Sequence, residues 1–188
     1  ANGTKLLFID DHINRLFESA EIIKLKVPWS KNQVRHWAYE TCLANIEYLK
    51  NSRVRINFSR GLGPDVPIDC YDQCIPSISI IVSKLSEHPD EINNLGASVL
   101  VVNLERVFPE SKNFNFLPSI FSLREAREGG YYDAIFMDRD GFITEATTGN
   151  IFFIKNGALY TTSSKILKGV TRKYIIEAAK DSGIKVVE

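Results

Sequence analysis

The chain contains 188 residues, 44% of them hydrophobic, with 23 basic and 23 acidic side chains and a formal net charge of zero. This composition is that of an ordinary globular protein with a sizeable core. The balanced charge argues against nucleic acid or an anionic membrane surface as the main partner, and no apolar run reaches the length of a membrane span. The 3 cysteines give no disulfide framework and fit a reducing compartment, so we expect a cytoplasmic protein.

No metal site is predicted from the sequence. Cys70 and Cys74 could share a metal ion, but no third or fourth ligand lies near them, and a structural role is by far the more common explanation for such a pair. The histidines His12, His36 and His88 are too scattered to suggest metal ligands.

The first half of the chain is predicted to combine short strands with two helices. An apolar strand at residues 6–9 leads into a helix that ends near Leu25. Ser30 is typical of an N-cap for a second helix, with a stripe that continues to Leu49. Alternating or apolar runs predict strands at residues 54–59, 78–82 and 98–104.

The most polar stretch, residues 86–91, marks the predicted boundary between domains of residues 1–88 and 89–188. In the second domain a helix at residues 118–128 is expected to end at Gly129-Gly130. A last helix begins near Val170. Strands joined by turns, as in antiparallel hairpins, are predicted at residues 132–137, 142–146 and 151–154. The fold class is therefore α+β.

Several side chains could carry chemistry, although each has an ordinary explanation by itself. Lys112 stands just before a helix, where a lone lysine is usually a solvated surface charge. Glu145 ends a strand, and Arg15 lies on a helix face where a salt bridge is the default. The argument for a functional site depends on their occurrence together with Gly169-Val170-Thr171-Arg172, which opens a helix.

Three segments in register, residues 145–152, 159–162 and 166–172, resemble the signature of the class IV aminotransferases. Asp11-His12-Ile13-Asn14-Arg15-Leu16 near the start is similar to the family as well, and the resemblance is weakest between residues 62 and 110. These are the fold-type IV pyridoxal 5′-phosphate (PLP) enzymes: branched-chain aminotransferases, D-amino-acid aminotransferases and aminodeoxychorismate lyase. The resemblance implies a small N-terminal α/β domain and a larger, strand-rich C-terminal domain that binds PLP.

The resemblance implies that Lys112 forms the internal aldimine with PLP, and its context Lys112-Asn113-Phe114-Asn115-Phe116-Leu117 is similar to the D-amino-acid branch. A lysine amine attacks the PLP aldehyde, and the freed Lys112 can then carry the proton at the substrate Cα. This requires an uncharged amine, which burial beside a cationic cofactor favours. Glu145 is expected to face the pyridine nitrogen and to favour the protonated ring, the stronger electron sink.

Further cofactor contacts are implied in the same way. Arg15 is expected to bind the phosphate through two parallel hydrogen bonds. The N–H groups of Val170 and Thr171 open a helix and add an anion site. Leu167 resembles the apolar residue that packs on the ring face away from the lysine, and Thr148 is expected to donate a hydroxyl hydrogen bond.

The substrate contacts are less closely specified, with His12, Arg55 and Thr147 as the candidates. His12 matches a family position near the cofactor edge, but it could equally be an ordinary residue of the helix start. The carboxylate trap of D-amino-acid aminotransferases has an arginine and a histidine after an Arg-Gly turn, and the residues after Arg60-Gly61 include neither. Arg55 or Arg60 could bind the carboxylate instead, although Arg55 could also be an exposed strand residue.

The predicted function is PLP-dependent transamination between a small amino acid and a 2-oxo acid. By resemblance, the site lies between the two domains of a homodimer and is completed by the neighbouring subunit. The first alternative is a lyase of the aminodeoxychorismate lyase type, against which the run Ile166-Leu167-Lys168-Gly169 argues weakly. The second is a catalytically inactive member that keeps the fold. Compared with the family, we expect the chain to be incomplete at both ends.

Overall fold

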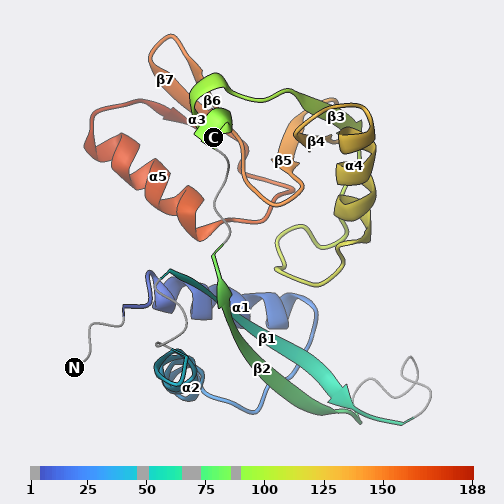
Figure 1. Ribbon diagram of the computed structural model, residues 1–188, viewed down its shortest axis with the longest axis vertical. Helices are drawn as coiled ribbons and strands as arrows, with labels where there is room; N and C mark the ends of the chain where they lie inside the picture. The colour runs from blue at the N-terminus through green and yellow to red at the C-terminus, as the bar shows by residue number, and fades with distance from the viewer. Residues whose placement is uncertain (1–4, 46–50, 65–72, 86–89) are drawn as a thin grey trace. The chain divides into compact units, whose positions relative to one another are not determined.

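The computed structural model describes residues 5–45, 51–64, 73–85 and 90–188 (Figure 1). The chain divides into two compact units, an N-terminal unit of residues 1–87 and a C-terminal unit of residues 88–188. The division falls next to the boundary expected at residue 88. Within the described part of the chain, no helix is both long and apolar enough to cross a membrane.

The N-terminal unit begins with the helix α1 (Ile9–Ile22) rather than with the strand predicted at residues 6–9, so that prediction is wrong. Leu7 and Phe8 form a turn, and Phe8 has a left-handed backbone with φ of 52°. Asp10 and Asp11 lie in the first turn of α1, where negative side chains favour a helix start. Among the residues that the structure describes, no strand pairs with residues 6–8, and the chain enters the helix at Ile9.

Helix α2 (Lys31–Leu43) begins at the predicted N-cap. The Ser30 hydroxyl accepts a hydrogen bond from the Gln33 backbone N–H at 3.2 Å, and the Gln33 side chain accepts one from the Ser30 N–H at 2.9 Å. This capping box satisfies two backbone donors that a helix start leaves unpaired. The predicted stripe is buried at Val34, Ala38 and Cys42. Its continuation at Ile46 and Leu49 lies outside the described residues.

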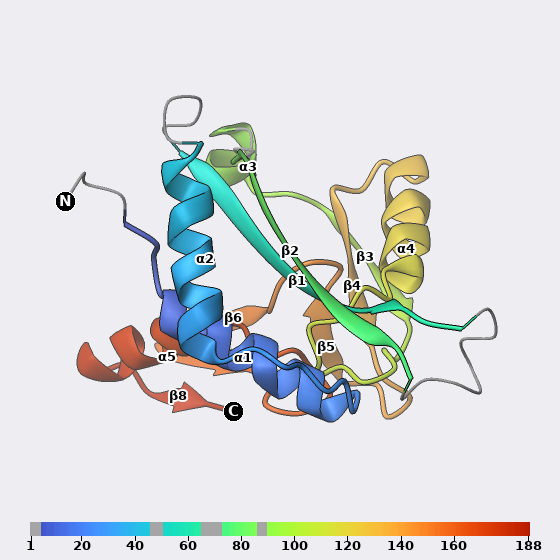
Figure 2. The same cartoon turned by 90° about the horizontal axis from the view of Figure 1, so that it is seen from below.

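Strands β1 (Ser52–Leu62) and β2 (Ile75–Lys84) form an antiparallel hairpin in the N-terminal unit. The predicted alternation is confirmed, because Phe58 is buried on the side that faces the helices whereas Arg55 on the other side is exposed. The core of this unit joins Ile13 and Ala20 of α1, Val34 of α2 and Phe58. Figure 2 shows α1 and α2 beside this hairpin.

The C-terminal unit contains two small sheets of three strands each, in the orders β3-β4-β5 and β6-β7-β8. The first sheet contains β3 (Val99–Asn103), β4 (Asp133–Met137) and β5 (Ile143–Ala146). The second contains β6 (Phe152–Lys155), β7 (Ala158–Thr161) and β8 (Val186–Val187). The helices are α3 (Asp90–Leu95), α4 (Leu117–Glu128) and α5 (Val170–Asp181). The short helix α3 and the strands β7 and β8 were not predicted.

Strands β3 and β4 run parallel, so α4 serves as the crossover helix between them and packs on both (Figure 1). The predicted hairpin of residues 132–137 and 142–146 is present, since β4 pairs antiparallel with β5. The predicted strand at residues 151–154 pairs antiparallel not with β5 but with β7, a strand that was not predicted. Asn156 and Gly157 have φ of 51° and 73° at the second turn, the left-handed pair that a tight hairpin requires. The connection from β3 to α4 therefore leaves the carboxyl end of a parallel strand, a frequent location of ligand sites.

Candidate active site

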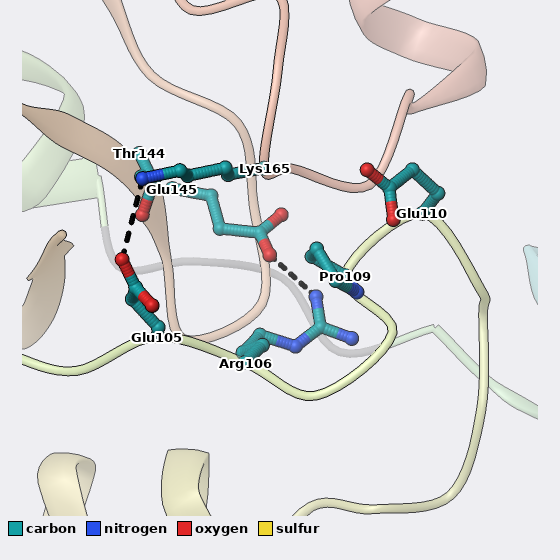
Figure 3. A pocket seen from close by; sticks show the side chains of 7 residues that line it. All are labelled: Glu105, Arg106, Pro109, Glu110, Thr144, Glu145 and Lys165. Atoms are coloured by element: carbon teal, nitrogen blue, oxygen red, sulfur yellow. Dashed lines mark hydrogen bonds and ion pairs between the residues drawn. The ribbon is translucent and has the colours of Figure 1, made fainter.

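Glu145 is the centre of the candidate site. It lies on β5 in the C-terminal unit and is only 4% exposed. Its Oε1 accepts a hydrogen bond from Arg106 Nη1 at 2.5 Å (Figure 3). Its Oε2 accepts one from the Leu167 backbone N–H at 3.0 Å. A carboxylate removed from water requires such partners, because burial without them is very unfavourable. The strand and its neighbours thus hold a buried negative charge in a fixed place.

Arg106 is a residue of the candidate site that the sequence analysis missed. It follows β3 and lies 39 positions from Glu145 in the sequence, yet the two side chains form an ion pair. The exposed fractions of the two side chains are 17% for Arg106 and 5% for Glu145, so water screens this pair little. The only signal in the sequence was a basic residue in the connection that also carries Lys112.

The segment between β7 and α5 is fixed against β5 by several hydrogen bonds. The Thr162 hydroxyl donates to the Ile143 carbonyl at 2.7 Å, and the Asn150 side-chain amide donates to the Leu167 carbonyl at 2.7 Å. Asn150 Oδ1 also accepts a hydrogen bond from the Gly169 N–H at 3.2 Å. A Cβ atom at Gly169 would approach Asn150 Oδ1 to 2.3 Å, so a side chain at this position would displace the Asn150 amide from its hydrogen bonds. These bonds give Asn150 a structural role in the fold.

The start of α5 provides donors for an anion. Gly169 is the N-cap and has no side chain that could cap the helix, and the first turn contains no acidic residue. In the described part of the chain, no acceptor is found for the backbone N–H groups of Val170 and Thr171. Free amides and the positive end of a helix of 12 residues favour a phosphate. Leu167, three positions before Val170, is 9% exposed and donates to Glu145, which keeps this helix start beside the buried carboxylate.

Lys112 lies in the connection between β3 and α4, next to the fully buried Ser111, and is itself exposed. The same connection is tied to Glu145 through Arg106, and Pro109 and Glu110 line one pocket with Glu145. Glu110 precedes Lys112 by two residues, which a fully extended chain spans in about 7 Å. The structure therefore brings the segment that carries Lys112 to the side of the strand that carries Glu145.

This pocket has a volume of about 270 Å³, close to the lower end of the range of roughly 300–1,000 Å³ for small-molecule sites. Its lining contains acidic and basic side chains in nearly equal number (Figure 3). The lining residues are Glu105, Arg106, Pro109, Glu110, Thr144, Glu145 and Lys165.

Lys165 lines the pocket, whereas Lys112 is not among its lining residues, and the sequence analysis did not consider Lys165. Its Nζ lies 2.8 Å from Asp138 Oδ2, 3.2 Å from Asp140 Oδ2 and 3.3 Å from Glu105 Oε1. The hydrogen bond to Asp138, followed by that to Asp140, raises the pKa of Lys165 well above its usual value. An amine that stays protonated has no lone pair for attack on an aldehyde, so Lys165 is not suited to the nucleophilic role predicted for Lys112.

The two threonines after β5 differ in their surroundings. Thr147 is buried, and its hydroxyl donates to Asp133 Oδ1 at 2.6 Å, while its N–H donates to the Ala134 carbonyl at 3.2 Å. Its hydroxyl proton is thus used inside the fold, although a substrate role had been predicted for it. Thr148 lies exposed in the bend that follows β5 and is the better placed of the two to donate to a ligand.

Three predicted site residues belong to the N-terminal unit. Arg15 and His12 lie one turn apart on α1, with Arg15 Nη2 at 3.4 Å from His12 Nδ1. Burial lowers the pKa of both groups, and the nearby Arg15 charge lowers that of His12 further. Arg55 is exposed on β1, opposite Ile81 of β2. Their roles toward a cofactor or a substrate stay predictions.

The residues of the C-terminal unit fit a phosphorylated pyridine cofactor. A fixed buried carboxylate suits a protonated ring nitrogen, and the amides at the start of α5 suit a phosphate. Leu167 provides an apolar surface between these two ends, and Lys112 provides an amine. We find no group of side chains that suits a metal ion among the described residues, and none was predicted.

Known proteins are similar to this chain in both sequence and fold. A protein of Methanocaldococcus jannaschii with the provisional name branched-chain-amino-acid aminotransferase is 33% identical over 97% of the chain. The aminodeoxychorismate lyase of Bacillus subtilis is 29% identical over 95% of it. The crystal structure of a branched-chain aminotransferase from Thermoproteus uzoniensis with norvaline is 30% identical, covers 96% of the chain and superposes with a TM-score of 0.85.

The chain spans 64% of the length of the M. jannaschii protein, 61% of the B. subtilis protein and 61% of the T. uzoniensis chain. The family described as amino-transferase class IV matches residues 1–188. PLP is the cofactor of that family, in agreement with the donor set described above, and its members have the mixed α+β fold found here. The chain belongs to the class IV aminotransferases.

Proposed function

We propose that the protein is a PLP-dependent aminotransferase that moves an amino group between a small amino acid and a 2-oxo acid. The observation that carries this proposal is the buried Glu145 carboxylate, held by Arg106 and the Leu167 amide beside the segment of Lys112. The family match supports the reaction class. The names of the relatives support branched-chain or D-amino acids as donors, since one relative is named a branched-chain-amino-acid aminotransferase and another a D-alanine aminotransferase.

Glu145 fixes a negative charge at the ring nitrogen. When bound, PLP supplies an electron sink for the bond broken at the substrate Cα, and a protonated ring is the stronger sink. The carboxylate stabilises that proton, whereas an amide at the same place would not. Arg106 and Leu167 hold the two oxygens in position before the cofactor arrives, so little reorganisation is needed.

Lys112 holds the cofactor covalently through its amine and afterwards moves the proton at the substrate Cα. For the second task the amine must be neutral, a condition that Lys165 with its three carboxylate partners does not meet. The amides of Val170 and Thr171 and the Thr171 hydroxyl bind the phosphate, and Arg15 adds a positive charge from the N-terminal unit. Leu167 packs against the ring, and Thr148 donates a hydrogen bond.

Substrate binding is assigned to residues of both units. Arg55 is proposed to bind the substrate carboxylate, with His12 near the cofactor edge and Thr147 near the substrate. The working form is proposed to be a homodimer in the cytoplasm, with a site completed by the neighbouring subunit. The lyase and inactive alternatives share the fold, and the B. subtilis relative carries the lyase name.

The proposal is tested with full-length protein, added PLP and a panel of L- and D-amino donors, each with a 2-oxo acid acceptor. We expect the protein to turn yellow and to convert one class of donor into its keto acid. Elimination from aminodeoxychorismate, without turnover of any donor, would instead support the lyase alternative. A preparation that stays colourless and turns over neither substrate would support the inactive alternative.

A further inference from the structure

Lys165 connects three segments that are far apart in the sequence. It lies on the segment between β7 and α5, and its partners Asp138 and Asp140 belong to the turn between β4 and β5. Its third partner, Glu105, lies on the connection that follows β3. Glu105 also reaches the same turn, where its Oε1 accepts the Arg139 backbone N–H at 3.3 Å. Lys165 and Glu105 both line the pocket of Glu145, and their ion pair crosses it (Figure 3). The turn that holds Asp138 and Asp140 leads into β5, the strand that carries Glu145.

The backbone of Lys165 is in the left-handed region, with φ of 56°. A residue with a Cβ atom seldom adopts this conformation, and it persists where surrounding contacts determine it. The side-chain exposed fraction is 5% for Asp138, so this partner is shielded from water, whereas Glu105 at 33% is partly exposed. A network of this kind orients its members more firmly than an isolated surface ion pair does.

Both hydrogen-bond donors of Glu145 stand on segments that Lys165 connects. Arg106 is the neighbour of Glu105, and Leu167 follows Lys165 by two residues. Without Lys165, the segment that carries Leu167 and the segment that carries Arg106 would lose the ion pair between Lys165 and Glu105, which links them. Thr162 and Asn150 would still hold the Leu167 segment, but with one tie fewer, and the Arg106 segment would lose its link to it.

We infer that Lys165 is a positioning residue, whose ammonium group keeps the two donors of the Glu145 carboxylate in place and so prepares the site for the cofactor. The part of this inference that concerns the cofactor depends on the proposed function. The part that concerns the Leu167 amide does not, because it can be measured on the cofactor-free protein. Lys165 acts through Glu145 and does not contact the reacting atoms.

The first measurement is the amide hydrogen exchange of Leu167 in cofactor-free, full-length Lys165→Met. We expect the Leu167 amide to exchange about tenfold faster than in the wild type, since its segment opens locally more often. The buried Ile176 of α5 should keep its wild-type rate, which separates local opening from general unfolding. Lys155→Met, an exposed lysine at the turn between β6 and β7, is the matched control and should change neither rate.

The second measurement is the affinity for PLP. We expect Lys165→Met to bind PLP about tenfold more weakly, as is found when a side chain that orients a site's ligand is removed, and Lys165→Arg to restore most of the affinity. The KM for the amino donor should stay unchanged. An unchanged Leu167 exchange rate in Lys165→Met would overturn the inference, and so would an unchanged PLP affinity.

If Lys165→Met does not fold, Asp140→Asn serves as the second test of the role of Lys165. The Asp140 side chain is 70% exposed, so removing its charge should cost little stability. This variant should raise the Leu167 exchange rate by a smaller factor, and no increase would contradict the role of Lys165. If the wild type itself binds no PLP, the proposed function fails. The exchange experiment then still tests the link between Lys165 and Leu167.

Discussion

The two units of the chain are stabilised in different ways. The N-terminal unit has an apolar, aromatic core. The rings of Phe17 and Phe58 pack edge to face with their centroids 5.3 Å apart, and the ring centroids of Trp29 and Phe58 are 5.5 Å apart. Around Glu145, the C-terminal unit instead depends on buried polar groups that bond to one another. An apolar core tolerates many similar residues, whereas a polar network requires particular donors at particular places. We therefore expect substitutions around Glu145 to affect function more selectively.

The largest effect is expected for Glu145→Gln. The variant should still bind PLP and turn yellow, but the turnover number should fall on the order of a hundredfold, because an amide does not stabilise the proton on the ring nitrogen. Steady-state kinetics with the preferred donor gives the value. Glu128→Gln, which alters an exposed ion pair with Arg124 on α4, is the control and should keep its turnover. Unchanged turnover in Glu145→Gln would refute the role assigned to this residue.

The complementary change in the apolar core is Phe58→Ala. The ring is 8% exposed and packs on Phe17 and Trp29, so its removal should lower the free energy of unfolding by about 3–5 kcal/mol. Denaturant unfolding measures this loss. The yellow colour of protein that remains folded should be unaffected. A loss below about 1 kcal/mol would mean that this cluster contributes much less than its burial indicates.

A smaller effect distinguishes the two roles considered for Thr147. Thr147→Val removes the hydrogen bond to Asp133 with little change of shape, and we expect a loss of about 1–2 kcal/mol in the free energy of unfolding. If the role is structural, the KM for the donor stays at the wild-type value. A markedly raised KM with unchanged stability would instead support the substrate contact predicted from the sequence.

The smallest effect concerns acid stability. The hydrogen bond from Lys165 lowers the pKa of Asp138, and the Arg139 backbone N–H followed by Lys165 lowers that of Glu105. A lowered pKa in the folded state stabilises the protein above the unfolded value of about 4, and this contribution disappears as the pH falls through the lowered value. Lys165→Met should therefore lose less stability between pH 5 and about 2 than the wild type, as measured by urea unfolding. Equal losses in the two proteins would contradict this assignment.

Local patterns in the sequence were sufficient for much of the fold. Ser30 and Gln33 are three residues apart and form the capping box on their own, and the stripe of α2 follows from its period. Residues 6–9 were misassigned because the period of a short apolar run does not distinguish a strand from the residues that lead into a helix. The parallel pairing of β3 with β4 joins segments separated by α4, and no local pattern encodes it.

The candidate site also contains residues that sequence motifs could identify and residues that only the structure reveals. Glu145, Leu167, Val170 and Thr171 lie in contiguous motifs, so a resemblance could identify them. The partners of Glu145 and Lys165 could not be identified, because Arg106 is 39 positions from Glu145, and Lys165 is 60 positions from Glu105. Their contacts depend on how β3, the turn after β4 and the segment before α5 come together. Only the folded structure brings these charges into one pocket.

The central claim is that Lys112, and no other lysine, holds the cofactor. Full-length protein loaded with PLP is reduced with borohydride and digested, and the peptides are analysed by mass spectrometry. We expect the phosphopyridoxyl group on the peptide that contains Lys112, while the peptide that contains Lys165 stays unlabelled because its amine remains protonated. A label on Lys165, or a yellow protein with no label at position 112, would contradict the account.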